Sequence, residues 1–114
     1  MPRNNEGPSR RSMRLADQIM RDLASLLAME LADPRLELVT ISGVRLNSDL
    51  SVATVYYTMH GDAERFKAAE SALYQARGLM RSRLAKGLNS KFVPELRFAR
   101  DEFLETMVYG QPHA

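Results

Sequence analysis

Hydrophobic residues recur every three or four positions over residues 12–32, a period typical of an amphipathic helix. Polar side chains such as Arg14 and Asp17 fill the opposite side. Glu30 falls inside the apolar arc, so we expect the last turn to be exposed. Asp33-Pro34 should end the helix, because the residue before a proline is disfavoured in the α conformation. The apolar arc comprises Leu15, Ala16, Ile19, Met20, Leu23, Leu26, Leu27 and Leu31.

Two strands are predicted next. Apolar residues alternate with polar ones over residues 39–46, but the phase of the alternation slips by one at Ser42-Gly43. A β-bulge at this point restores a single inward face, because it inserts one extra residue. Asn47-Ser48-Asp49 is typical of a turn, and residues 51–58 alternate again. These features predict a β-hairpin.

The following segment has a helical period with one interruption. Asp62 is a suitable N-cap, and apolar residues then follow at helical spacing until Gly78. A glycine inside a helix costs roughly 1 kcal/mol relative to alanine, so we expect a kink or break within Ala76-Arg77-Gly78 rather than one long helix. Met80, Leu84 and Leu88 continue the apolar stripe after it, and residues 96–98 alternate as a short final strand.

The order is therefore helix, strand, strand, helix, kink, helix, strand. It predicts an α+β fold of two layers, with a three-stranded sheet and the helices on one of its faces. We expect a flexible basic arm over residues 1–11, one folded domain over residues 12–102 and a C-terminal tail over residues 103–114.

The amino-acid composition excludes several kinds of functional site. The 114 residues include no cysteine, which excludes disulfides, thiolate metal sites and thiol nucleophiles. No apolar run approaches the ~20 residues that span a bilayer, and the N-terminus MPRNNEGPSRRS does not resemble a signal peptide. We expect a cytoplasmic monomer without membrane contact.

Groups for catalysis are sparse. His60 lies in a predicted loop and His113 in the tail, and the sequence has no phosphate-binding glycine loop, no HExxH motif and no nucleophile elbow. Carboxylates such as Asp17 and Asp62 are typical of solvated helix faces and caps. We therefore expect no catalytic residue, metal, cofactor or small-molecule substrate. A hydrolase that acts through carboxylates remains an alternative.

Basic residues are concentrated in two blocks. The net charge is +2, yet residues 77–100 hold seven basic side chains against Glu95 alone, and residues 22–76 hold four against eight acids. A broken helix exposes backbone N–H groups that attract phosphates. Gly78 would let the backbone of a nucleic acid approach the helix closely, and Arg or Lys side chains would add long-range attraction for its phosphates. Tyr56 faces a position where it could stack on a base, but a half-buried strand residue is the favoured interpretation. The predicted RNA-binding residues are Arg10, Arg11, Arg14, Arg77, Gly78, Arg81, Arg83, Lys86, Lys91 and Arg97.

The order of elements resembles a type II KH domain. KH domains clamp nucleic acid with a Gly-x-x-Gly loop between two helices, and no two glycines here are three apart. Ala76-Arg77-Gly78 occupies the corresponding place, and an Ala-x-Gly kink there resembles the ribosome-binding factor A family. Further segments similar to that family, in the same order, are Asp33-Pro34-Arg35-Leu36, Ser42-Gly43-Val44, Asp49-Leu50, Ala53-Thr54-Val55-Tyr56 and Val93-Pro94-Glu95-Leu96 with Phe98.

This resemblance implies a factor for late assembly of the bacterial small ribosomal subunit. Such a protein binds free or immature 30S subunits through 16S rRNA, assists maturation of the 16S 5′ end, and matters most in the cold. Its expected partners are small-subunit rRNA and the 30S subunit. Two alternatives stay open. One is a protein-interaction module that docks its acidic middle segment on a basic partner, and the other is a general structured-RNA or DNA-binding domain.

Overall fold

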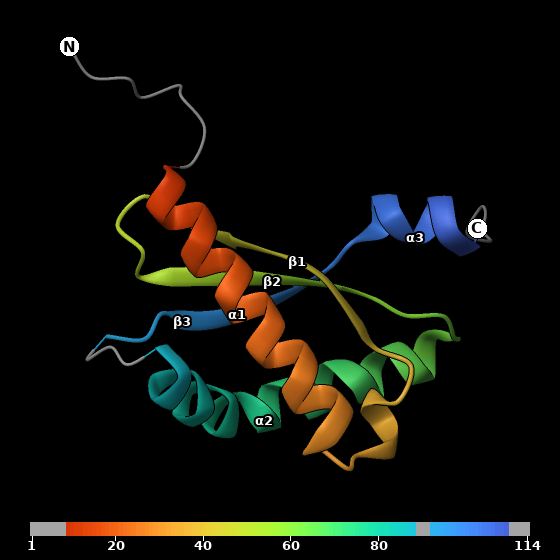
Figure 1. Cartoon of the computed structure of the whole chain (residues 1–114). Coiled ribbons are helices and arrows are strands. Elements are labelled where there is room, and N and C mark those ends of the chain that lie inside the picture. The colour runs from red at the N-terminus through yellow and green to blue at the C-terminus, as the bar shows by residue number, and fades with distance from the viewer. Residues whose placement is uncertain (1–8, 89–91, 110–114) are drawn as a thin grey trace.

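The computed structural model describes residues 9–88 and 92–109. The sheet has the strand order β1-β2-β3, with β1 antiparallel and β3 parallel to β2. The long helix α2 is the crossover that parallel neighbours require (Figure 1). The elements are α1 (Arg10–Met29), the 3₁₀ turn η1 (Pro34–Leu36), β1 (Thr40–Leu46), β2 (Val52–Thr58), α2 (Ala63–Leu88), β3 (Glu95–Arg100) and α3 (Glu102–Tyr109).

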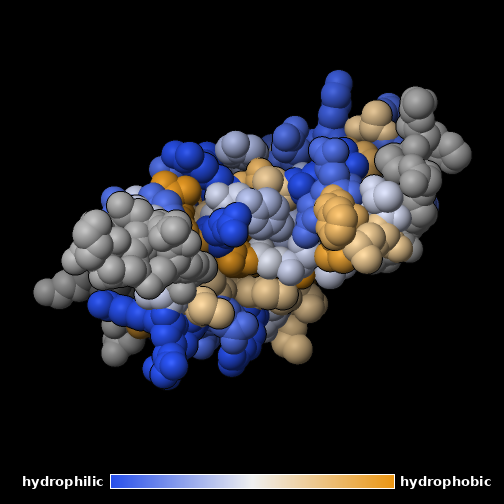
Figure 2. All heavy atoms as spheres, turned by 90° about the horizontal axis from the view of Figure 1, so that it is seen from above, coloured by the Kyte–Doolittle hydropathy of each residue, from blue (hydrophilic) through white to orange (hydrophobic). Residues whose placement is uncertain are grey.

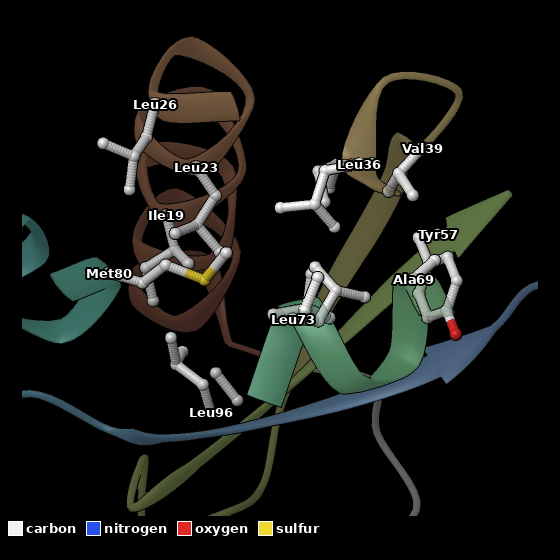
Figure 3. Close-up of a cluster of buried hydrophobic side chains, with 14 of the residues drawn as sticks. Ile19, Leu23, Leu26, Leu36, Val39, Tyr57, Ala69, Leu73, Met80 and Leu96 are labelled. Carbon is white, nitrogen blue, oxygen red and sulfur yellow. The ribbon is translucent and has the colours of Figure 1, made fainter. Parts of the chain in front are cut away.

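The predicted α+β architecture is confirmed, and its core lies between the sheet and the two longer helices. Figure 3 shows side chains from α1, α2 and β3 converging on one cluster. Each of these side chains adds roughly 1.5–3 kcal/mol of apolar burial. The most completely buried members are Ile19, Leu23, Val55, Leu73, Met80, Leu84 and Leu96.

The bulge predicted in the first strand is present. Ile41 pairs with Tyr57, whereas Gly43 pairs with the preceding residue, Tyr56, so Ser42 is the inserted residue. Its hydroxyl donates to an Asp101 Oδ at 3.0 Å. The insertion keeps Ile41 and Leu46 buried on the same side of the sheet.

The helix boundaries differ by a few residues from the prediction. Helix α1 begins at Arg10, because the Ser9 hydroxyl accepts from the Ser12 amide at 3.0 Å and caps the first turn. It ends at Met29, ahead of Asp33-Pro34, and Asp33 instead caps η1. Residues 1–8 of the predicted N-terminal arm lie outside the described residues.

Helix α2 corrects the predicted break. It is α-helical at every residue from Ala63 to Leu88, and Figure 1 shows it changing direction where its colour passes from green to teal. Its apolar stripe continues across Gly78, since Leu73, Met80 and Leu84 all pack into the core. Burial of these three side chains outweighs the roughly 1 kcal/mol that the glycine costs. The two predicted helices are therefore segments of one.

Residues of the predicted C-terminal tail form the short helix α3. Asp101 caps it by accepting from the Leu104 amide at 3.0 Å. The buried Glu105 carboxylate accepts from the Met59 amide at 3.1 Å and from the Arg100 guanidinium at 2.8 Å. An eight-residue helix is marginal alone, so these contacts with the end of β2 and with β3 hold it in place.

The Glu105 contacts generate a stability prediction. Glu105→Ala leaves the buried Met59 amide without its acceptor, so we expect a loss of about 1–3 kcal/mol in the free energy of unfolding. Amide hydrogen exchange in α3 should rise by more than in α1. Glu102→Ala, a change of an exposed carboxylate in the same helix, is the matched control. Equal exchange in the two variants would contradict this role for Glu105.

A close crossing of α1 and α2 generates a second prediction. A Cβ at Gly87 would lie 2.7 Å from an Asp22 carboxylate oxygen, and that carboxylate also accepts from Gln18 at 2.9 Å. We expect Gly87→Ala to lower the melting temperature in the natural background and not in Asp22→Ala. The double-mutant cycle should give a coupling of about 0.5–3 kcal/mol. If the effects of the two substitutions on stability were additive, a side chain at residue 87 would fit at the helix crossing without conflict with Asp22.

Candidate nucleic-acid interface

The basic side chains of α2 fall on two different flanks of the helix. Arg81 lies on the flank beside β3, where its guanidinium donates to the Val93 carbonyl at 3.2 Å. Arg83 lies on the other flank and forms an ion pair with Glu30 at the end of α1. Two residues along a helix turn the side chain by about 200°, which separates these neighbours. The structure thus divides a cluster that the sequence presented as one.

An aromatic side chain joins the β3 flank. Tyr74 is 49% exposed, and the Arg77 guanidinium carbon lies 4.4 Å from the centre of its ring. The edge of Phe98 from β3 supports the tyrosine, with ring centres 6.4 Å apart. Stacked guanidinium and phenol groups are the surface on which unpaired bases stack. We define Tyr74, Arg77, Gly78 and Arg81 as the α2 flank site.

Sequence reasoning missed Tyr74 and considered Tyr56 instead. Tyr56 pairs with Gly43 and Ala99 in the sheet and is only partly exposed. Helical spacing could have identified Tyr74, because it lies three residues before Arg77 and outside the apolar arc. Its partner Phe98 could not be found that way, since the contact joins two elements that are distant in sequence.

Gly78 lies on the same exposed side, four residues after Tyr74. A Cβ built on Gly78 would meet no atom within 4 Å, so the fold does not need a glycine for space there. The expected exposure of N–H groups at a broken helix is wrong, because residue 78 lies inside a continuous helix whose amides are occupied. What remains is a bare stretch of helix surface that a phosphate or ribose can approach closely.

Two predicted RNA-binding residues are neutralised within the protein. Arg83 pairs with Glu30, and Arg97 pairs with Glu95 at 3.1 Å. Both pairs are largely exposed, so an incoming phosphate can compete for them at a modest cost. Arg77, Arg81 and Lys86 form no ion pair with any residue that the structure describes.

The remaining predicted residues lie apart from the α2 flank site. Arg10, Arg11 and Arg14 are exposed in the first two turns of α1, and Figure 1 shows α1 beginning on the side of the molecule where α2 ends. Figure 2 shows strongly hydrophilic side chains on that side and hydrophobic ones around α3 on the other. Lys91 lies outside the described residues.

Two other kinds of feature, clusters of metal-binding side chains and membrane-spanning helices, are absent from the described part of the chain. Residues 9–88 and 92–109 hold no group of three or more His, Cys, Asp or Glu side chains that could bind a metal ion. Within the same ranges, no helix combines the length and the apolar character that crossing a bilayer requires.

Comparison with known proteins agrees on one family. The family model for ribosome-binding factor A matches residues 11–110. Ribosome-binding factor A of Alcanivorax borkumensis is 49% identical over 92 residues, which cover 80% of this chain and 67% of the relative. That of Nitrosomonas eutropha is 41% identical over 95 residues, covering 83% and 81%.

Comparison with solved structures identifies the same family. The crystal structure of ribosome-binding factor A from Thermus thermophilus superposes with a TM-score of 0.69 at 34% identity, covering 78% of this chain and 94% of that one. A model of the Thermus thermophilus factor fitted into the cryo-electron-microscopy map of a 30S complex gives a TM-score of 0.65 at 34% identity, covering 77% and 92%. Family model, relatives and structures together show that this chain belongs to the ribosome-binding factor A family.

Proposed function

We propose that this protein binds the small ribosomal subunit through 16S rRNA, with the α2 flank site as its main contact. The Thermus thermophilus relative has been fitted into a 30S complex, which supports the ribosomal partner. The observation that carries the proposal is an exposed aromatic ring stacked with Arg77 on the same flank as Arg81, two arginines that no carboxylate neutralises in the described part of the chain.

Each member of the site has a distinct role in this proposal. Arg77 and Arg81 contact phosphates, and their attraction acts over about a Debye length. Tyr74 stacks on an unpaired base, because single-stranded RNA is recognised largely through stacking. Gly78 lets the sugar-phosphate backbone reach the helix surface, where a larger side chain would hold it away.

The other basic residues extend the surface. Lys86 and the α1 arginines Arg10, Arg11 and Arg14 supply phosphate contacts on the side of the molecule where α2 ends. With Arg77 and Arg81 they make six cations without an internal ion pair among the described residues. Such a surface reads the shape of folded rRNA and the positions of its phosphates rather than a base sequence.

The cellular role in this proposal is late assembly. The protein stabilises one arrangement of 16S rRNA helices in free or immature 30S subunits, assists maturation of the 16S 5′ end, and matters most at low temperature, where misfolded RNA rearranges slowly. It therefore sediments with 30S subunits and not with 70S ribosomes or polysomes. Sucrose-gradient fractionation of a cell extract, followed by blotting for this protein, tests the assignment.

The six cations of the proposed RNA-binding surface give a prediction for the salt dependence of 30S binding. Six phosphate contacts give a slope of about −4 to −5 for log affinity against log salt concentration, and each cation contributes slightly less than one. We expect the double change Arg77→Gln and Arg81→Gln to reduce the slope by about 1.5 and to move the protein out of the 30S fractions. Binding of 30S subunits is measured by filtration at several salt concentrations.

Arg65→Gln is the matched control, because this exposed arginine lies in the first turn of α2 on the opposite flank. It should leave both the slope and the sedimentation nearly unchanged. An equal loss in the control would mean that net charge alone governs binding. Equal affinity for duplex DNA in competition would favour the general nucleic-acid-binding alternative.

We predict that replacing Gly78 with alanine stabilises the protein but weakens its binding to 30S subunits. Gly78→Ala meets no atom and improves helix propensity, so we expect a gain of about 1 kcal/mol and a melting temperature roughly 4 °C higher. If rRNA approaches the helix at this point, 30S affinity should fall at least fivefold in the same variant. A stabler protein with unchanged affinity would remove Gly78 from the interface.

A further inference from the structure

An apolar groove lies on the side of the sheet away from the α2 flank site. It runs between the second half of α1, the turn η1 and the start of β1, and its volume is about 600 Å³. Leu27 and Leu31 form one wall, and Leu36, Val39 and Ile41 form the other. The volume is within the range of ordinary ligand and peptide sites.

One wall of the groove is the free edge of the sheet. The strand order β1-β2-β3 leaves β1 with a single neighbour, so its outer edge carries backbone N–H and C=O groups without a strand partner. Thr40 and Ile41, the first two residues of β1, both line the groove. An extended segment placed there gains backbone hydrogen bonds and apolar burial together.

The charge of the groove is negative. Asp33 and Glu37 are the only charged side chains in its lining. Hydrogen bonds from the Arg35 side chain lower the pKa of Asp33, but the same ion pair neutralises its charge, so the net negative charge of the groove comes from Glu37. Glu37 forms no ion pair with any residue that the structure describes. A polyanion such as RNA is disfavoured at this edge, and a basic ligand is favoured.

Two exposed apolar residues are neighbours of lining residues in the sequence. Met29, at the end of α1, is 83% exposed, and Leu38, between η1 and β1, is 45% exposed. Leu38 adjoins the start of β1, and an exposed apolar residue next to a free strand edge is unfavourable for an isolated protein, because it invites unwanted strand pairing.

We propose that this groove binds an extended segment of another protein, in which apolar residues alternate with Lys or Arg. The segment adds to the free edge of β1, places its apolar side chains between α1 and η1, and directs a basic side chain toward Glu37. The groove shares no residue with the α2 flank site, which lies beside β3 at the opposite edge of the sheet, and the Arg35–Gln75 hydrogen bond of 3.0 Å joins η1 to the other flank of α2. One molecule can therefore hold RNA and a protein segment at the same time.

A library of random ten-residue peptides displayed on phage tests this inference on the full chain. We expect enrichment of peptides that alternate apolar and basic residues, and synthetic copies should shift the amide signals of residues 39–42 in NMR spectra. Ala28→Trp fills the groove from an exposed position on α1 and should weaken binding at least tenfold. Ala63→Trp, at an exposed position in α2 that does not line the groove, is the matched control.

A charge-reversal variant of the groove provides a second test of the proposed peptide binding. Glu37→Lys should weaken the selected peptides at least fivefold, while both groove variants keep the natural affinity for 30S subunits. Loss of 30S affinity in Ala28→Trp would overturn the claim of independent sites. The inference also fails if no peptide is enriched, if enriched peptides bind Ala28→Trp normally, or if Ala28→Trp abolishes a concentration-dependent dimer, which would make a second copy the occupant.

Discussion

Packing of two helices against one face of a three-stranded sheet is the constraint from which the rest of this structure follows. Val55 and Leu96 on the sheet meet Met80 and Leu84 on α2 with no exposed surface. Because α2 connects β2 to the parallel strand β3, it lies toward the β3 edge, and α1 packs chiefly over β1. The two edges of the sheet therefore have different neighbours and different chemistry.

The two glycines of α2 have different structural surroundings. At Gly87 the neighbouring helix comes so close that a Cβ would overlap the Asp22 carboxylate. At Gly78 the surroundings are open, so packing does not explain the glycine, and we propose a role in binding instead. Burial on both sides of Gly78 keeps the helix continuous, and its change of direction is a bend within an unbroken element.

Electrostatic pairing decides which basic residues are available to a ligand. Arg83 and Arg97 have carboxylate partners within the fold, whereas Arg77 lies on the ring of Tyr74. A guanidinium that is stacked on an aromatic ring keeps its charge and its outward donors, because the ring occupies only one face. The proposed contact therefore centres on a smaller surface than the ten residues predicted from the sequence, and it includes an aromatic ring.

The sequence by itself determined the strands, the two longer helical segments, the bulge at Ser42-Gly43 and the family, because these depend on local spacing and turn chemistry. It predicted a kink or break at Gly78, where the helix bends without breaking, because local propensity does not register the burial of Met80 and Leu84 against distant elements. Only the tertiary structure decided that Arg81 contacts Val93 while Arg83 pairs with Glu30, that Phe98 supports Tyr74, and that Glu105 anchors α3. Each of these joins residues that are far apart in the chain, and a linear pattern carries no information about such contacts.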